Sequence, residues 1–225
     1  MTDDATRTTP EATAPERERP TVAIVLAAGG GTRWTGDGHK LLARLAGAAV
    51  VVHAVRAAVE AAIGPVLVVT GAVALPASIG ELGQVTVVHH PGWEAGQATS
   101  LAAGVSAADR LGAAAVVVGL GDQPFITPEA WRAVAASESP IAMASYDGRA
   151  RNPVRLARTV WPLLPATGDE GARVVAQMFP GLVEQVPCAG SPADIDTLDD
   201  LSSAADLNDA EDIRTWQSRS STNSP

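Results

Sequence analysis

One stretch of the sequence, residues 27–40, combines several glycines with two cationic side chains. It has the sequence AAGGGTRWTGDGHK, in which Arg33 and Lys40 are the cations and Lys40 is the only lysine of the chain. Backbone amides of a glycine run can approach an anion closely because no side chain stands in the way. The stretch therefore predicts a phosphate-binding loop; the alternative is a tight turn whose two charges are solvated.

Two common phosphate-binding motifs do not fit this loop. A P-loop needs glycine before its lysine and serine or threonine after it, where this chain has His39 and Leu41. The dinucleotide fingerprint would need glycine at Trp34 and an acidic residue after the second expected strand, where Thr70 stands. The sequence therefore predicts neither a P-loop nor a standard dinucleotide-binding loop.

Carboxylates follow the loop in two places. Asp122 follows the apolar run 116–120 after a single glycine, at a place where a carboxylate is costly to bury unless it is paired or bound to a metal. Asp194 and Asp196 alternate with Ile195, so they share one face of an extended segment and both remain candidates for a second ligand. Alternatively, Asp122 caps a turn, and the acids near 196–200 begin a helix.

The elements expected to position these residues alternate along the chain. Short apolar runs at 22–26, 66–69, 85–88 and 115–118 predict buried strands, and 141–145 and 153–156 predict weaker ones. Helices are expected at 50–62, 97–111, 128–136 and 171–179. The order predicts an α/β fold, a three-layer α/β/α sandwich with a mainly parallel sheet. Ligands of such sheets bind beyond the carboxyl ends of the strands.

Composition limits the classes of function. The chain has 225 residues and a net charge of −9, which disfavours nucleic-acid binding. Its single cysteine, Cys188, and the lack of a long apolar run indicate a soluble, cytoplasmic protein without a membrane partner. Residues 1–20 and 213–225 are expected to be flexible tails around one domain at 21–212.

Several motifs together resemble a known family. The loop LAAGGGTR with Lys40 is similar to the signature of nucleotidyltransferases with the nucleotide-diphospho-sugar transferase fold. GDQP at 121–124, NP at 152–153, GDEGAR at 168–173 and DIDTLDDL at 194–201 follow in order. Over 22–201 the chain resembles the molybdenum cofactor cytidylyltransferases, a branch of the MobA-like NTP transferases.

The resemblance implies a Mg²⁺-dependent transfer of CMP from CTP to a molybdopterin-type phosphate, with release of pyrophosphate. A molybdenum hydroxylase or its chaperone is the implied protein partner. The implied catalytic residues are Arg33, Lys40 and Asp122, and the implied metal ligands are Asp122 and Asp196. The expected nucleotide-binding residues are Leu26, Ala27, Ala28, Gly29, Gly30, Gly31, Thr32, Arg33, Lys40, Thr70, Ser100 and Asp122.

Three other functions stay open at this point. The acceptor can be another phosphorylated metabolite or a sugar phosphate. The fold can serve an NAD(P)H-dependent oxidoreductase, which the missing dinucleotide fingerprint disfavours. A cofactor-binding chaperone without turnover has little need of a triphosphate-and-metal site.

A few further side chains have two interpretations each. His39 can contact phosphate, and Arg149 with Arg151 can bind a second phosphate or be solvated. Ser100 and its neighbours at a helix start can meet an anion or only cap the helix. His53 and Cys188 are expected to be packed structural residues.

Overall fold

The computed structural model describes residues 19–169 and 171–205. Residues 1–18 of the expected N-terminal tail, the whole expected C-terminal tail at 213–225, and residues 206–212 of the expected domain lie outside the described residues. Within the described ranges, no helix has the length and apolar character that a bilayer span requires.

A seven-stranded sheet forms the centre of the fold, in the order β5-β4-β1-β6-β8-β7-β9. The pairs β5–β4, β4–β1, β1–β6 and β7–β9 are parallel, whereas β8 runs antiparallel to both of its neighbours. The strands of this sheet are β1 (Thr21–Ala27), β4 (Val66–Thr70), β5 (Val85–His89), β6 (Ala115–Leu120), β7 (Ile141–Tyr146), β8 (Arg149–Ala157) and β9 (Val183–Pro187). A separate hairpin pairs β2 (Arg44–Leu45) with β3 (Ala48–Ala49).

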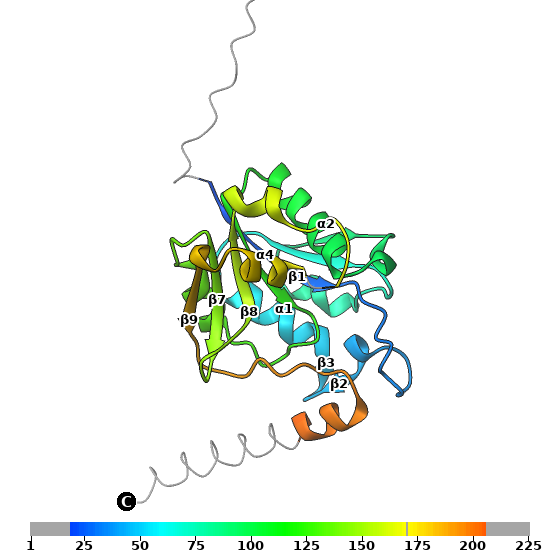
Figure 1. Cartoon of the computed structure of the whole chain (residues 1–225). Coiled ribbons are helices and arrows are strands. Elements are labelled where there is room, and N and C mark those ends of the chain that lie inside the picture. Colours follow the sequence, from blue (N-terminus) through cyan, green and yellow to red (C-terminus); the bar gives the residue numbers. More distant parts are fainter. Residues whose placement is uncertain (1–18, 170, 206–225) are drawn as a thin grey trace, which may run out of the picture.

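Helices cover both faces of the sheet, which gives the three layers that the sequence predicts (Figure 1). Alternate strand residues divide between two apolar clusters: α1 and α3 pack on one face, α2 and α4 on the other. The α-helices are α1 (Val50–Glu60), α2 (Gln97–Arg110), α3 (Pro128–Ala135) and α4 (Ala172–Met178). The short 3₁₀ helices are η2 (Lys40–Leu42), η3 (Ala77–Leu82), η4 (Trp93–Ala95), η5 (Arg158–Leu163) and η6 (Pro180–Leu182).

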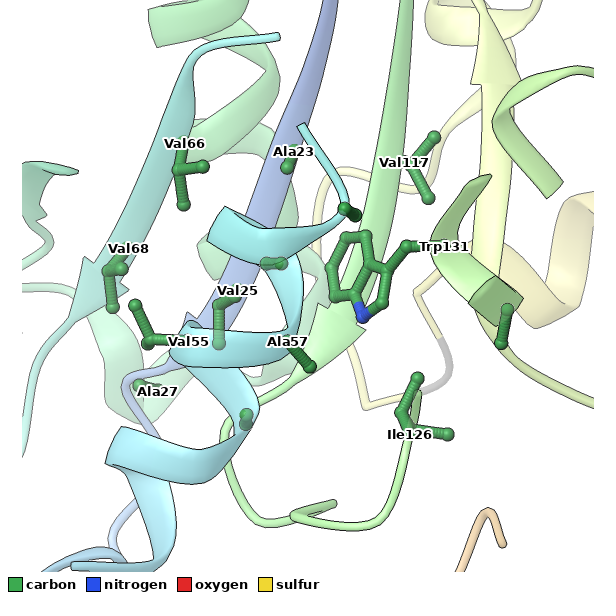
Figure 2. Packing of buried hydrophobic residues seen from close by; sticks show 14 of the residues in the cluster. Ala23, Val25, Ala27, Val55, Ala57, Val66, Val68, Val117, Ile126 and Trp131 are labelled. Carbon is green, nitrogen blue, oxygen red and sulfur yellow. The ribbon is translucent and has the colours of Figure 1, made fainter. Parts of the chain in front are cut away.

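Trp131 of α3 is the largest fully buried side chain on its face of the sheet. Figure 2 shows its indole beside Ala57 of α1 and Val117 of β6. The neighbouring β6 residue, Gly119, leaves room for the ring, because a Cβ atom there would lie 2.5 Å from Trp131 Cζ2. The close fit fixes α3, and with it the loop that leaves β6, against the sheet.

The expected strands and helices are all present, with shifts of a few residues at their ends. The prediction for α1 was too long: the helix ends at Glu60, and Ala62 has a positive φ of 53° that a helix does not allow. The sequence analysis did not predict the β2–β3 hairpin or β9, whereas the helical turns at 198–205 match its alternative interpretation of the acids near 196–200 as a helix start.

The register of β1 and β6 brings the glycine loop beside Asp122. Leu26 pairs with Leu120, and the amide of Gly121 donates to the Leu26 carbonyl at 2.8 Å. Because the two strands are parallel, the loops that follow them leave the same edge of the sheet. The glycine loop and Asp122, the first candidate metal ligand, are therefore neighbours.

Candidate functional site

The glycine loop presents a row of free amide groups. In the described structure, the N–H groups of residues 29–33 donate to no protein acceptor, while Trp34 donates to the Gly31 carbonyl and closes a turn. Gly31 has a φ of 62°, a conformation that glycine adopts without strain. Gly29 and Gly30 line a cavity of about 290 Å³. Unpaired amides beside a cavity favour an anion as its occupant.

His39 holds this loop in place. Its Nδ1 accepts from the amide of Leu41 at 3.2 Å, so its Nε2 carries the proton and donates to the Gly29 carbonyl at 3.0 Å. Burial lowers the pKa of His39 and favours this neutral form. Both ring nitrogens have protein partners, so His39 stabilises the conformation of the loop in this structure.

Lys40 lies between two carboxylates. Its Nζ is 2.6 Å from Asp122 Oδ2 and 2.6 Å from Asp196 Oδ1, and the residue is only 9% exposed. Arg33 reaches the other oxygen of the same acid, with Nη2 2.7 Å from Asp196 Oδ2. The three residues that the sequence proposes as catalytic are thus linked: Arg33 and Lys40 both pair with Asp196, and Lys40 also pairs with Asp122.

The charges of this cluster stabilise one another. Burial alone would lower the pKa of Lys40, but Asp122 and Asp196 outweigh it and raise that pKa above its ordinary value. Burial would raise the pKa of Asp196, but the hydrogen bond and charge of Lys40, with Arg33, lower it. Asp194 has no such cation, and burial beside Asp196 and Asp122 raises its pKa. Near neutral pH the cluster therefore holds Lys40 and Asp196 charged.

Two sets of hydrogen bonds fix the segment that carries Asp194 and Asp196. The amide of Ile195 donates to the backbone carbonyl of Asp122 at 2.9 Å. Downstream, Asp200 Oδ2 accepts from the amides of Asp196 and Thr197 at 3.1 and 2.8 Å, and Thr197 Oγ1 accepts from the Asp200 amide at 3.2 Å. This reciprocal cap begins the helical turns at 198–205, in agreement with the helix-start interpretation of Asp200.

Gln123 is a buried link that the sequence analysis did not single out. Its Oε1 accepts from Asn152 Nδ2 at 3.1 Å, and its Nε2 donates to the Pro192 carbonyl at 3.1 Å. One amide thereby ties the loop after β6 to β8 and to the segment that leads into Asp196. The neighbouring Pro124 and Asn152 motifs were the available sequence signal, but their contact depends on the tertiary fold.

The carboxylates fit a divalent cation. Asp122 Oδ1 is buried and has no hydrogen-bond partner in the described structure, and Asp196 lies across Lys40 from it. Among the described residues, no group of three or more His, Cys, Asp or Glu side chains forms a complete metal site. One or two carboxylates, completed by phosphate oxygens and water, are the ligands that Mg²⁺ prefers. Asp122 and Asp196 suit a metal that arrives with a phosphorylated substrate.

The predicted nucleotide-binding residues divide into three groups. Leu26, Ala28, Gly29, Gly30, Ser100 and Asp122 line the 290 Å³ cavity. Arg33 and Lys40 line the adjoining cavity of about 430 Å³ together with Asp194 and Asp196. Ala27, Gly31, Thr32 and Thr70 line neither; Thr70 is buried, and its carbonyl accepts from the His90 amide at 2.8 Å.

Further lining residues were not among the predicted site residues, although Gln97 stands at the helix start, and Asp169 and Arg173 in the GDEGAR motif, that the sequence analysis considered. Trp93, Gln97 and Asp169 line the smaller cavity, and Arg173 lines the larger one. Trp93 packs so closely over the glycine loop that a Cβ on Gly30 would lie 2.9 Å from its ring. The PGW sequence after the third strand was the only local signal for Trp93.

The residues expected to be structural lie away from these cavities. His53 Nε2 donates to the Leu45 carbonyl at 2.8 Å, which ties α1 to the β2–β3 hairpin. Cys188 Sγ donates to the Val186 carbonyl at 3.3 Å, and burial raises the pKa of the thiol.

Comparison with known proteins identifies a family. The profile of the MobA-like NTP transferase domain matches residues 23–185. The purine catabolism protein PucB of Bacillus subtilis is 34% identical over 109 residues, 46% of this chain and 53% of that protein. The 3-deoxy-manno-octulosonate cytidylyltransferase of Methylorubrum populi is 39% identical over 109 residues, 48% of this chain and 42% of that protein. The chain thus spans about half the length of these two relatives.

Solved structures share the fold. Rv0371c of Mycobacterium tuberculosis superposes with a TM-score of 0.69 at 22% identity, over 84% of this chain and 98% of that chain. A nucleotidyl transferase from Methanothermobacter gives the same TM-score at 23% identity, over 84% and 97%. Rv0371c has also been solved in complex with manganese; that structure has a TM-score of 0.60 at 23% identity, over 83% and 98%. These likenesses confirm the expected fold.

Proposed function

Because the chain belongs to the MobA-like NTP transferase domain family, we propose that it transfers a nucleotidyl group from a nucleoside triphosphate to a phosphorylated acceptor. The observation that supports this most directly is the row of free amides at 29–33 beside the cluster of Lys40, Asp122 and Asp196. The amides suit a polyphosphate, and the carboxylates suit the cation that accompanies it. The proposed catalytic domain covers residues 21–212, and the proposed location is the cytoplasm.

In the proposed reaction, an oxygen of the acceptor phosphate attacks the α-phosphorus of the triphosphate. The new oxygen–phosphorus bond forms as the bond from the α-phosphorus to the bridging oxygen breaks, and pyrophosphate leaves with that oxygen. Such transfers depend mainly on positioning and charge neutralisation. The loop amides and Arg33 bind the departing phosphates, while Lys40 adds positive charge beside the carboxylates. No nucleophilic side chain is required.

We assign the divalent cation to Asp122 and Asp196, with Mg²⁺ as the proposed ion. When bound, it neutralises phosphate charge and polarises the phosphorus that is attacked. Lys40 joins the same two carboxylates, so it keeps them correctly spaced when substrate is absent. Asp194, which lines the same cavity without a cation of its own, is the alternative second ligand.

CTP and a molybdopterin-type phosphate are the proposed substrates. The Ala27-Ala28-Gly29 opening of the loop resembles the cytidine-using branch of the family, and one relative is named as a cytidylyltransferase. The same relative is named for a sugar-acid substrate, which favours a sugar acceptor as the second candidate. A molybdenum hydroxylase or its chaperone is the proposed recipient of the product.

The test is a pyrophosphate-release assay with each nucleoside triphosphate, Mg²⁺ or Mn²⁺, and molybdopterin or sugar acids as acceptors. We expect release that depends on acceptor and metal, is fastest with CTP, and falls at least 100-fold in Asp122→Asn. Arg56→Gln, which changes an arginine on α1 outside both site cavities, serves as the matched control. Absence of release with every nucleotide and acceptor, in folded protein, would refute the proposal.

A further inference from the structure

Two more cavities continue from the carboxylate cluster, and each shares an arginine with the one before it. The 430 Å³ cavity around Lys40 and Asp196 is also lined by Arg173. A cavity of about 560 Å³ shares Arg173 and is lined by Arg151 as well. A third cavity, of about 340 Å³, shares Arg151 and adds Arg149. We call the 560 Å³ cavity the arginine groove; the 340 Å³ cavity meets it at Arg151 but is also lined by Tyr146, which belongs to the apolar cluster on the other face of the sheet.

The fold explains why this groove begins at the proposed reaction centre. Since β8 is antiparallel to β6, the start of β8 lies at the same edge of the sheet as Asp122. Asn152 of β8 bonds to Gln123, next to Asp122, and the preceding residues Ala150 and Arg151 line the groove. Arg173 comes from the first turn of α4, which lies beside β8 in Figure 1. The groove therefore leads from the carboxylates over the β7–β9 end of the sheet.

The arginine groove has a strong excess of positive charge. It is lined by Arg151 and Arg173 without any acidic residue, and the neighbouring 340 Å³ cavity adds Arg149 and one acid, Asp147. In the described structure the side chains of Arg149 and Arg173 have no hydrogen-bond or ion-pair partner, and the Arg151 side chain donates only to the Ala150 carbonyl, at 3.0 Å. Unpaired arginines gathered in a concave surface are suited to bind phosphate or carboxylate groups.

The rest of the groove wall suits the body of a small molecule. Met143, Ala150, Ala176 and Val183 give the groove an apolar lining, and Gln177 and Gln185 add amides that donate and accept hydrogen bonds. Its volume lies in the range of ordinary small-ligand sites. By contrast, four carboxylates line the 430 Å³ cavity at the cluster. An anionic group of the acceptor is therefore bound more favourably in the arginine groove than beside these carboxylates.

We propose that the acceptor carries a second anionic group besides the phosphate that attacks, and that Arg151 in the arginine groove binds it. Arg173, at the junction of the two cavities, then faces the attacking phosphate, and Arg149 extends the anion site outward. This inference rests on the proposed nucleotidyl transfer and defines its acceptor as a small molecule with at least two anionic groups. An acceptor with a single phosphate would leave Arg151 without a partner.

The first test compares steady-state kinetics of Arg151→Gln with the Arg56→Gln control. Loss of one charge-assisted contact predicts an acceptor KM about tenfold higher in Arg151→Gln, with the KM for CTP unchanged. Arg149→Gln is expected to raise the acceptor KM less. Thermal unfolding of each variant checks that the exposed substitutions leave the fold intact. An unchanged acceptor KM in Arg151→Gln would overturn the inference while leaving the proposed transfer in place.

The second test measures anion binding without turnover. With Mg²⁺ and a non-hydrolysable CTP analogue filling the nucleotide site, inorganic phosphate is titrated while the arginine Nε–Hε signals are followed by NMR. We expect saturable shifts at Arg151 and Arg173. The phosphate affinity that they report should fall at least fivefold in Arg151→Gln and stay unchanged in Arg56→Gln. Equal phosphate affinity in Arg151→Gln, or no saturable shift, overturns the anion site. Intact binding in a protein that transfers no nucleotide supports the anion site and refutes only the proposed reaction.

Discussion

Replacing Lys40 by methionine removes the cation between Asp122 and Asp196 while nearly preserving the length of the side chain. Both carboxylate contacts are 2.6 Å, and the lysine and Asp196 are 9% and 6% exposed. Removing one partner of a buried ion pair costs about 3–5 kcal/mol, because the remaining charge stays desolvated. Arg33 still holds Asp196 Oδ2, so we expect the lower end, a loss of about 3 kcal/mol.

The assay is urea unfolding followed by tryptophan fluorescence, first with EDTA and then with saturating Mg²⁺. A divalent cation can take the place of the ammonium, so Mg²⁺ should stabilise Lys40→Met more than it stabilises the wild type. Arg132→Met is the control, because Arg132 belongs to an exposed pair with Glu129. Such pairs contribute about 0–1 kcal/mol.

The stability difference between wild type and Lys40→Met should depend on pH in both the alkaline and the acidic range. The pKa of Lys40 is raised in the fold, so its contribution is complete below its ordinary value of about 10.4 and is lost as pH rises through the raised value. The pKa of Asp196 is lowered, so its contribution is present above about 3.9 and is lost as pH falls through the lowered value. Equal stability at pH 7, or a difference that does not shrink as the pH falls below about 3.9, would refute this reasoning.

Three further predictions concern single residues. Arg33→Gln should change the unfolding free energy by less than about 1 kcal/mol, since the Arg33 side chain is 72% exposed, yet raise the KM for the triphosphate; an unchanged KM contradicts its assigned role. Gln123→Ala removes the link from Asn152 to Pro192 and should weaken Mg²⁺ binding in a calorimetric titration, whereas wild-type affinity would show that Asp196 is held without it. Gly64→Ala would place a Cβ 2.0 Å from the Thr21 carbonyl oxygen at a φ of 147°. We therefore expect the free energy of unfolding in urea to fall by more than about 3 kcal/mol, and a soluble variant of normal stability would contradict the backbone argument.

The sheet and the glycine loop were predictable because their signals are local. Apolar runs such as 22–26 and 115–118 identify buried strands, and parallel pairing then places the loop beside Asp122. The β2–β3 hairpin was not predictable in this way. Its turn uses Ala46 with a φ of 45°, and alanine gives no sequence signal for that conformation.

The pairing of Lys40 with both acids also depends on the tertiary structure. The position of Asp122 follows from strand order, but Asp196 arrives through β9 and the contact of Ile195 with the Asp122 carbonyl. The contacts of Gln123 depend on the tertiary structure as well, because its side chain joins two segments that are distant in sequence. The resemblance to a family proposed Lys40, Asp122 and Asp196 as site residues; their distances required the fold.

The burial of the single lysine also affects how the protein reacts with amine reagents. Lys40 carries the only side-chain amine of the chain, and its ion pairs keep that amine protonated and largely shielded from solvent. Acylating reagents act on the neutral, accessible amine, so they should modify this lysine very slowly in the resting protein. A ligand that draws Lys40 away from Asp122 and Asp196 would change its rate of acylation. Mass spectrometry after a brief acylation pulse could therefore report the occupancy of the site without a fluorophore or an engineered cysteine.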